Sequence, residues 1–184
     1  DPSNPVPTVG GANFLPGLLQ ARNSGPKSQE QVESRKDVLV FTSEPLCEDI
    51  EVTGLIRAKL WVSSTAPSAD WTARLCEVDD TGASIGLVDG IIRSHQEQSA
   101  PHQIEIRLGH VSHLFRCGRR IRLQLASSNF PRFDRNTQSG VSATGAREPE
   151  FCFAEHTVFG GPELRSRVMM AVIERPFPLI SGLA

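Results

Sequence analysis

The amino-acid sequence predicts an all-β protein in which two antiparallel sheets pack face to face as a sandwich. About eight or nine segments show the alternation of apolar and polar residues that gives a strand one buried face. Gly, Pro, Asn and Asp residues separate these segments at fairly regular intervals, and no amphipathic helix longer than about two turns is evident. Many short strands joined by frequent turns are typical of a β-sandwich.

Length and charge narrow the class of protein. At 184 residues the chain suits a single domain with a sizeable core. A net charge of −2, with acidic and basic residues interspersed, gives no field that would select nucleic acid or an anionic membrane. No apolar run approaches the roughly 20 residues that span a bilayer, and the N-terminus does not read as a signal peptide. We therefore expect a soluble, cytoplasmic chain without nucleic-acid or membrane partners, whose sequence starts within a longer protein.

The first part of the chain reads as a linker, because Pro and Gly dominate stretches such as Pro5–Gly11. Four large apolar side chains interrupt it: Phe14, Leu15, Leu18 and Leu19. Each would forgo about 1.5–3 kcal/mol if it stayed in water, so this patch needs a neighbour. We assign residues 1–36 to a linker that is partly packed on the sandwich, and residues 37–184 to the sandwich domain.

The strands are expected in chain order from Val38 onward. They cover residues 38–42 and 50–65, a run that leads into a turn at 78–82, the run 87–93 that follows this turn, and residues 103–108, 120–126, 155–159 and 166–173. Gly54 indicates a bulge in the second of them. The last is apolar on both faces, which predicts a central or doubly covered position. Pro131 ends the strand over 120–126, so we expect Phe130–Asn136 to be an ordered loop.

The sequence contains a G-x-S-x-G pattern, Gly82–Gly86, centred on Ser84. In an α/β-hydrolase this pattern follows a buried strand and opens a helix, so that a sharp turn presents the serine hydroxyl to a histidine. Here an acidic turn precedes it and β-branched residues follow it, which favours a β-hairpin. We expect no catalytic residue in this chain.

Histidine and cysteine residues show no spacing typical of a metal site. We expect the five histidines to be exposed or in loops: His95, His102, His110, His113 and His156. We expect the four cysteines to be reduced and to pack as small apolar residues: Cys47, Cys76, Cys117 and Cys152. Neither a metal nor another cofactor is expected.

Six arginines gather in one part of the sequence: Arg116, Arg119, Arg120, Arg122, Arg132 and Arg135. Asp134 lies among them and the whole chain is slightly acidic. We therefore interpret them as a solvated sheet face with local ion pairs and not as a phosphate-binding patch.

Four stretches carry a resemblance to a known family, in the same order along the chain. They are Asp1–Gly11, a block made of Thr53-Gly54, Trp61–Ser64, Ala66-Pro67 and Asp70–Leu75, then Asp89–Arg93, and the block Ser-Ser-Asn-Phe-Pro-Arg-Phe-Asp-Arg-Asn at 127–136. They resemble the C-terminal domain of the cocaine esterase and X-prolyl dipeptidyl peptidase family of serine hydrolases. The resemblance covers most of the chain.

The resemblance implies a jelly-roll β-sandwich of the galactose-binding-like type that carries no catalytic triad and stabilises an α/β-hydrolase domain of the same protein. That parent would be a dipeptidyl-peptidase or a serine esterase acting on esters, amides or Xaa-Pro peptides. Phe14 and Leu15 would come near the mouth of its active site and form an apolar wall of the substrate pocket. The oligomeric state stays open, with a homo-oligomer among the alternatives.

Two other functions compete with this one. A free-standing carbohydrate-binding module would use Trp61 or Trp71 as a sugar-stacking platform, which a sandwich fold allows. A self-sufficient enzyme would be built on Ser84. The strand positions of both tryptophans and the hairpin context of the serine favour the non-catalytic domain over either alternative.

Overall fold

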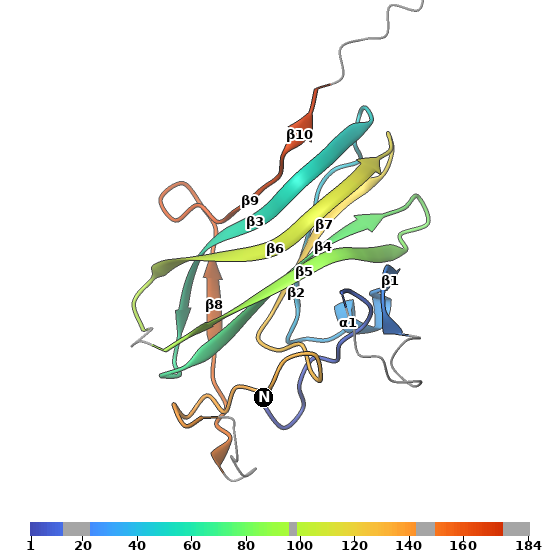
Figure 1. The fold of residues 1–184 in the computed structure, drawn as a ribbon. Helices are drawn as coiled ribbons and strands as arrows, with labels where there is room; N and C mark the ends of the chain where they lie inside the picture. The colour runs from blue at the N-terminus through green and yellow to red at the C-terminus, as the bar shows by residue number, and fades with distance from the viewer. Residues whose placement is uncertain (13–22, 96–98, 143–149, 175–184) are drawn as a thin grey trace, which may run out of the picture.

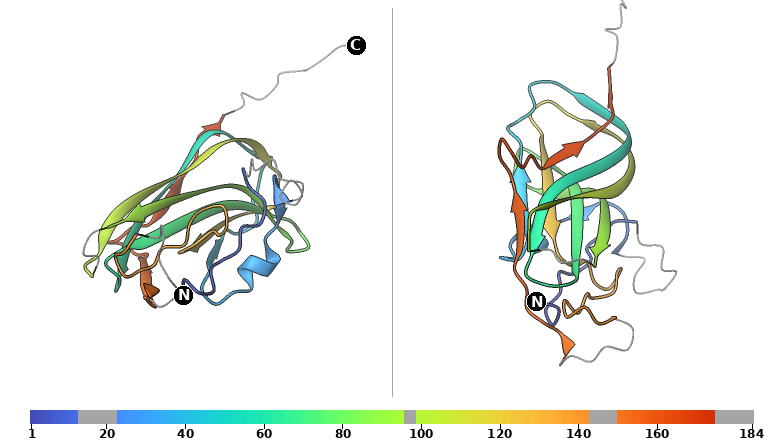
Figure 2. Two further views of the ribbon diagram at one scale, coloured as in Figure 1. Left: turned by 60° about the horizontal axis from the view of Figure 1, so that its bottom comes forward. Right: turned by 90° about the vertical axis from the view of Figure 1, so that its left-hand side faces the viewer.

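The computed structural model describes residues 1–12, 23–95, 99–142 and 150–174. Within these ranges the chain forms ten strands and one short helix. The strands build two five-stranded sheets that pack face to face, as Figures 1 and 2 show. All strand pairs in both sheets are antiparallel. The all-β sandwich predicted from the alternation pattern is confirmed.

The first sheet has the strand order β1-β5-β4-β7-β2. Its strands are β1 (Lys27–Ser28), β2 (Leu39–Thr42), β4 (Ala69–Val78), β5 (Ser84–Ser94) and β7 (Arg120–Ala126). Strand β4 lies at its centre, and nine of its ten residues are buried. Its apolar residues, such as Trp71 and Leu75, belong to the main core. Polar residues alternate with them and are buried as well, so β4 is covered on both faces.

The second sheet is built around β3 (Ile50–Ser64). Strand β6 (His102–Phe115) runs along one edge of β3. Three short strands share its other edge: β8 (His156–Phe159), β9 (Arg167–Met169) and β10 (Val172–Ile173).

Two sequence predictions in this sheet were wrong. The segment 166–173 does not form one central strand but splits into β9 and β10 at the sheet edge, where Val172 and Ile173 are 53% and 44% exposed. Its apolar residues line an edge because β3 is long enough to be paired by several short strands. The bulge is not at Gly54: Ile56 pairs with Gly109 and Arg57 with Arg107, so the extra residue lies in β6.

The main core lies between the two sheets. It consists of apolar residues from β3, β4, β6 and β7. They are Val52, Ile56, Ala58, Leu60, Val62, Ala69, Trp71, Ala73, Leu75, Ile104, Ile106, Leu108, Phe115 and Leu125. A second, smaller cluster unites Val6, Val32 and Val38 with the partly buried Ala126 of β7. Val32 belongs to the helix α1 (Glu30–Glu33).

The N-terminal part of the chain therefore covers the polar side of the first sheet. Within residues 1–36, β1 pairs with β5 and the isolated bridge Pro7↔Phe130 joins the first residues to the loop after β7. The division of the chain into a linker and a sandwich domain at residue 36 stays a prediction about a longer protein. No helix among the described residues is long and apolar enough to cross a membrane.

Candidate functional site

A buried carboxylate, Asp89 of β5, is the centre of a polar network beneath the N-terminal segment. Its side chain is 3% exposed. The Oδ1 atom accepts a hydrogen bond from Arg132 Nη1 at 2.6 Å, and Oδ2 accepts from Asn129 Nδ2 at 2.8 Å and from Arg74 Nη2 at 3.3 Å. A buried carboxylate is tolerated when its lone pairs are satisfied in this way, and charged donors give the strongest of these bonds.

The network extends to the N-terminal segment through side chains and backbone. Thr8 Oγ1 donates to Asn129 Oδ1 at 2.7 Å, and Arg74 Nη1 donates to the carbonyl oxygen of Val9 at 2.8 Å. The backbone N–H of Thr8 donates to the Phe130 carbonyl at 2.7 Å. Residues 6–9 are thereby fastened to both the sheet and the loop after β7.

The residues that flank the segment 13–22 are held next to each other at this network. Gly11 and Gly25 exchange two backbone hydrogen bonds of 2.9 Å each. Asn23 accepts from the Gly10 N–H at 2.8 Å through Oδ1 and donates to the Thr8 carbonyl at 2.7 Å through Nδ2. The residues on either side of the segment therefore form a closed, hydrogen-bonded base.

Steric constraints at this base explain why positions 10 and 11 of the Pro-Val-Pro-Thr-Val-Gly-Gly stretch are both glycine. Gly10 and Gly11 have φ angles of +66° and +85°, a region that L side chains rarely adopt. A Cβ atom on Gly10 would lie 2.5 Å from the Gly25 carbonyl oxygen, and one on Gly11 would lie 2.8 Å from Asp89 Oδ1. Side chains at these positions would push the base away from the network.

Phe14 and Leu15, the expected pocket-wall residues, lie outside the described residues, as do Leu18 and Leu19. Their role stays a prediction. The described residues that precede and follow them, such as Gly11 and Asn23, lie at the hydrogen-bonded base.

A second ion pair, formed by the buried carboxylate of Asp70 and the half-buried Arg93, holds the far end of the loop after β7. Arg93 binds both oxygens of Asp70, at 2.6 Å through Nε and 2.7 Å through Nη2. This bidentate bond raises the pKa of Arg93 above its ordinary value, against the opposing effect of burial. Asn136 Nδ2 donates to the same carboxylate at 2.9 Å. The loop expected over Phe130–Asn136 is thus bonded to the sheet through side chains near both of its ends.

The four stretches that carried the family resemblance meet at these two networks. Each contributes at least one of the bonded side chains: Thr8, Asp70, Arg74, Asp89, Arg93, Asn129, Arg132 and Asn136. The alternation pattern gives no sign of this convergence, because polar residues that alternate with a core face are ordinarily solvated. The signal that could have revealed it is the apolar residues of the N-terminal segment, such as Val6, which need a surface to cover.

Ser84, the serine of the G-x-S-x-G pattern, opens strand β5 in the hairpin after β4. It is 1% exposed, and its hydroxyl donates to Glu33 Oε1 at 2.7 Å. The same Glu33 carboxylate binds Arg122 and Gln124 of β7. The serine therefore fastens helix α1 to the sheet.

Three histidines depart from the expectation that all five are exposed or in loops, because His102, His113 and His156 lie half-buried in strands. His113 of β6 bonds Glu77 at 2.6 Å. His156 of β8 packs edge-on against Trp71, with ring centroids 5.1 Å apart, and burial lowers its pKa. Strand pairing carries both rings against the neighbouring sheet, which spacing along the chain cannot show. Among the described residues, no group of three or more His, Cys, Asp or Glu side chains is placed to hold a metal ion.

The cysteines divide into two classes. Cys76 of β4 is buried, and burial raises the pKa of its thiol to about 12. Cys47, Cys117 and Cys152 are exposed, contrary to the expectation that they pack as apolar residues. The reason is their location, since all three lie outside the strands.

The arginines and tryptophans are occupied by contacts within the chain. Five of the six clustered arginines lie within 4.0 Å of an acidic side chain: Arg116, Arg119, Arg120, Arg122 and Arg132. The remaining one, Arg135, lies over the rings of Phe130 and Phe151. Trp71 is 4% exposed and Trp61 is half-buried in β3, so neither forms an open platform for a sugar ring.

Comparison with known proteins agrees with this arrangement. Cocaine esterase from Rhodococcus sp. (strain MB1 Bresler) is 35% identical over 185 residues, which cover 95% of this chain and 32% of that protein. The crystal structure of an aminopeptidase from the marine sediment archaeon Thaumarchaeota archaeon matches 95% of this chain and 32% of its own, with a TM-score of 0.81 and 27% identity. A selenomethionine-labelled α-amino acid ester hydrolase matches 94% of this chain and 31% of its own, with a TM-score of 0.81 and 26% identity.

The chain spans about a third of the length of these relatives. The family model of the X-Pro dipeptidyl-peptidase C-terminal non-catalytic domain matches residues 5–169. That range includes both polar networks and all strands of the first sheet. The chain belongs to the family of X-Pro dipeptidyl-peptidase C-terminal non-catalytic domains.

Proposed function

We propose that this β-sandwich is the non-catalytic domain of a larger serine hydrolase, in which it packs on an α/β-hydrolase domain and presents the segment 13–22 to the substrate pocket. Phe14 and Leu15 form an apolar part of the pocket wall. The parent enzyme acts on esters, amides or Xaa-Pro peptides and works in the cytoplasm. The sandwich shapes specificity and performs no chemical step.

The observation that carries this proposal is the closed base of the segment 13–22. A segment that only linked two domains would need no such fastening. Here the residues that flank it, Gly11 and Gly25, are bonded to each other, and the preceding residues are tied to the buried carboxylate of Asp89 through Asn129 and Arg74. Such an anchor is required where the loop it carries must keep one position relative to a reacting group, since small displacements of substrate-positioning groups are costly to catalysis.

An apolar surface on the sandwich supports a second domain as its neighbour. The edge strand β2 exposes Leu39 and Phe41, which are 42% and 52% accessible. Beside it, a groove of about 330 Å³ between the two sheets is lined by Phe41, Leu123 and Phe159. Exposed apolar edges of this kind are commonly covered by another element in the complete protein.

The test is a kinetic comparison in the full-length enzyme. Phe14→Ala and Leu15→Ala are expected to raise KM about tenfold for substrates with a large acyl group or side chain, because the truncations remove apolar contact surface from the bound state. The values of kcat and the rate of labelling by a fluorophosphonate should stay close to those of the parent. A series of p-nitrophenyl esters and Xaa-Pro p-nitroanilides of graded size measures both the effect and the substrate class.

The matched control is Phe153→Ala, since Phe153 is 82% exposed and lies among the described residues outside the strands. This variant should leave KM unchanged. If Phe14→Ala and Leu15→Ala left every kinetic constant unchanged while lowering the melting temperature of the sandwich, these side chains would belong to its own core and the pocket-wall role would be wrong.

A further inference from the structure

Two of the exposed cysteines lie against each other at one end of the sandwich. Cys47 follows strand β2, and Cys117 lies in the turn between β6 and β7. The Cys117 Sγ atom is 3.3 Å from the carbonyl oxygen of Cys47, although 70 positions separate the two residues in the sequence. A carbonyl oxygen is about 2.4 Å from its own Cα, so this contact brings the Cys117 sulfur within about 6 Å of the Cys47 Cα.

The backbone around the two cysteines has the geometry of an antiparallel pair. Leu46 N donates to the Arg119 carbonyl and Gly118 N donates to the Leu46 carbonyl, both at 2.8 Å. Gly118 has a φ of +83°. These are the features of a glycine bulge, in which Gly118 and Arg119 together oppose Leu46.

The positions next to this bulge are Cys47 on one side and Cys117 on the other. The Cys117 N–H does not bond to Cys47 but to Asp49 Oδ1, at 2.8 Å. The upper bound of about 6 Å between the Cys117 sulfur and the Cys47 Cα is compatible with the Cα separation of about 4.4 to 6.8 Å that a disulfide requires.

The same contact joins the two sheets. Strands β2 and β7 belong to the first sheet, and β3 and β6 belong to the second. The connection from β2 to β3 and the turn from β6 to β7 therefore both cross between the sheets, at the same end of the sandwich (Figure 1). A covalent bond between Cys47 and Cys117 would close this end.

We propose that Cys47 and Cys117 are a modification site that is oxidised reversibly to an intramolecular disulfide by a small disulfide oxidant such as oxidised glutathione. The thiolate of one cysteine attacks a sulfur of the oxidant, which forms a mixed disulfide and releases one glutathione thiolate. The second cysteine thiolate attacks the protein sulfur, forms the Cys47–Cys117 bond and releases the other glutathione. Two protein thiols lose two electrons and two protons, and one oxidised glutathione becomes two reduced ones. An exposed disulfide of this kind is accessible to reduction by thiols, which makes the bond reversible.

The experiment compares the reduced and oxidised full chain. In the reduced folded chain the three exposed thiols should react with a thiol reagent and the buried Cys76 should not. After treatment with oxidised glutathione at low protein concentration, one thiol should remain reactive and the intact mass should fall by about 2 Da, the mass of two hydrogens. Digestion without reductant should yield one peptide pair joined through Cys47 and Cys117. The melting temperature should rise by about 5–10 °C and return to its original value with dithiothreitol.

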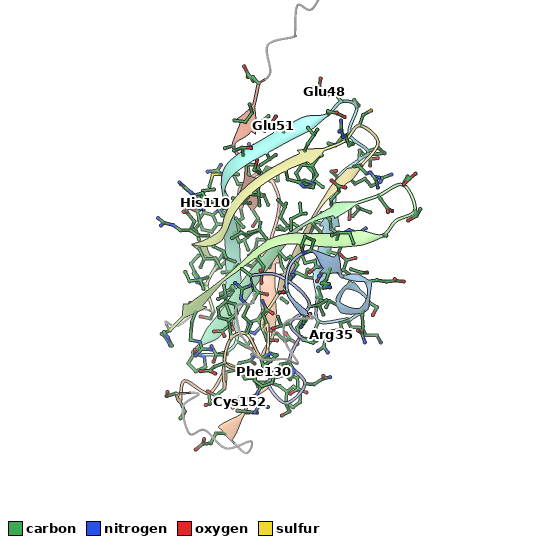
Figure 3. The ribbon with its side chains drawn as sticks, turned by 45° about the vertical axis from the view of Figure 1, so that its right-hand side comes forward. Arg35, Glu48, Glu51, His110, Phe130 and Cys152 are labelled. Atoms are coloured by element: carbon green, nitrogen blue, oxygen red, sulfur yellow. The ribbon has the colours of Figure 1, made fainter. Side chains whose placement is uncertain are left out.

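Two serine variants separate this site from general thiol oxidation. Cys47→Ser should lose the crosslink and the shift in melting temperature, while its reduced form melts with the reduced parent. Cys152→Ser is the matched control and should form the crosslink normally. Figure 3 shows Glu48, the neighbour of Cys47, at one end of the molecule and Cys152 at the other. Stable glutathione adducts on both Cys47 and Cys117, or a crosslink between two copies of the chain, would overturn the proposal.

Discussion

The substitution Asp89→Asn tests whether the buried network holds the N-terminal segment in place. It keeps the size of the side chain, removes its charge and replaces one acceptor oxygen by an NH₂ donor. Arg74 and Arg132 then lose the negative charge that both of them bind, at 3.3 and 2.6 Å. At an effective dielectric constant of about 20, two unit charges about 4 Å apart attract each other by about 4 kcal/mol. The cost of desolvating the groups offsets part of this attraction.

Breaking such a buried pair from one side costs about 3–5 kcal/mol, because the other charge stays buried without compensation. For a chain of 184 residues this corresponds to a melting temperature lower by about 10 °C. The free energy of unfolding is measured by urea denaturation monitored by tryptophan fluorescence. Hydrogen exchange should also show faster exchange of the backbone amides of Gly11 and Gly25, which close the base of the segment 13–22.

The matched control is Asp80→Asn, the same chemical change in an exposed ion pair. The Asp80 side chain is 85% exposed and lies 3.6 Å from Arg119. The Asp80→Asn substitution should lower the free energy of unfolding by less than about 1 kcal/mol. Equal losses in the two variants, or unchanged exchange at Gly11 and Gly25 in Asp89→Asn, would refute the role of the network as an anchor.

Two further predictions follow from buried polar side chains. Burial lowers the pKa of His156 against the opposing effect of Asp70, so the folded chain binds fewer protons than the unfolded chain near pH 6. The free energy of unfolding should therefore fall as the pH drops below about 6.5. In urea denaturation between pH 7.5 and 5.5, His156→Gln should show a shallower fall than the parent. Equal dependence of the unfolding free energy on pH in the two proteins would contradict this assignment. Ser84→Ala should lower the free energy of unfolding by about 1–2 kcal/mol, because it leaves Glu33 without one buried donor. A fluorophosphonate should label neither form of the isolated chain, and a stoichiometric adduct on Ser84 would reverse its structural assignment.

The sequence was sufficient for the fold class and most of the strands. Alternation in residues 103–108 and 120–126 marks β6 and β7 because a half-buried strand repeats its environment every two residues. The loop chemistry after Ala126 was equally local, since Pro131 cannot continue a central strand. The hairpin context of Ser84 was also readable, because a nucleophile elbow needs a helix directly after the serine.

Position within a sheet was not readable from the chain. The segment 166–173 has the apolar character of a central strand, yet it lies at the edge of β3 because neighbouring strands are chosen by long-range packing. The two exposed cysteines at 47 and 117 show the same limit. Their separation of 70 positions gives no sign that the two connections between the sheets lie side by side.

The candidate site was decided almost entirely by the tertiary structure. The sequence alone indicated that Asp70, Arg74 and Asp89 belong to strands and that the N-terminal segment carries apolar residues without a partner. Whether those charges face water depends on what covers the sheet, and the covering segment lies more than sixty positions earlier than Arg74, which binds the carbonyl of Val9. Buried charges must be paired with one another. The N-terminal segment can therefore cover this face of the sheet only because the charges beneath it form a network. Periodicity identifies one face of a strand as buried, but only the folded chain determines that the other face is buried too.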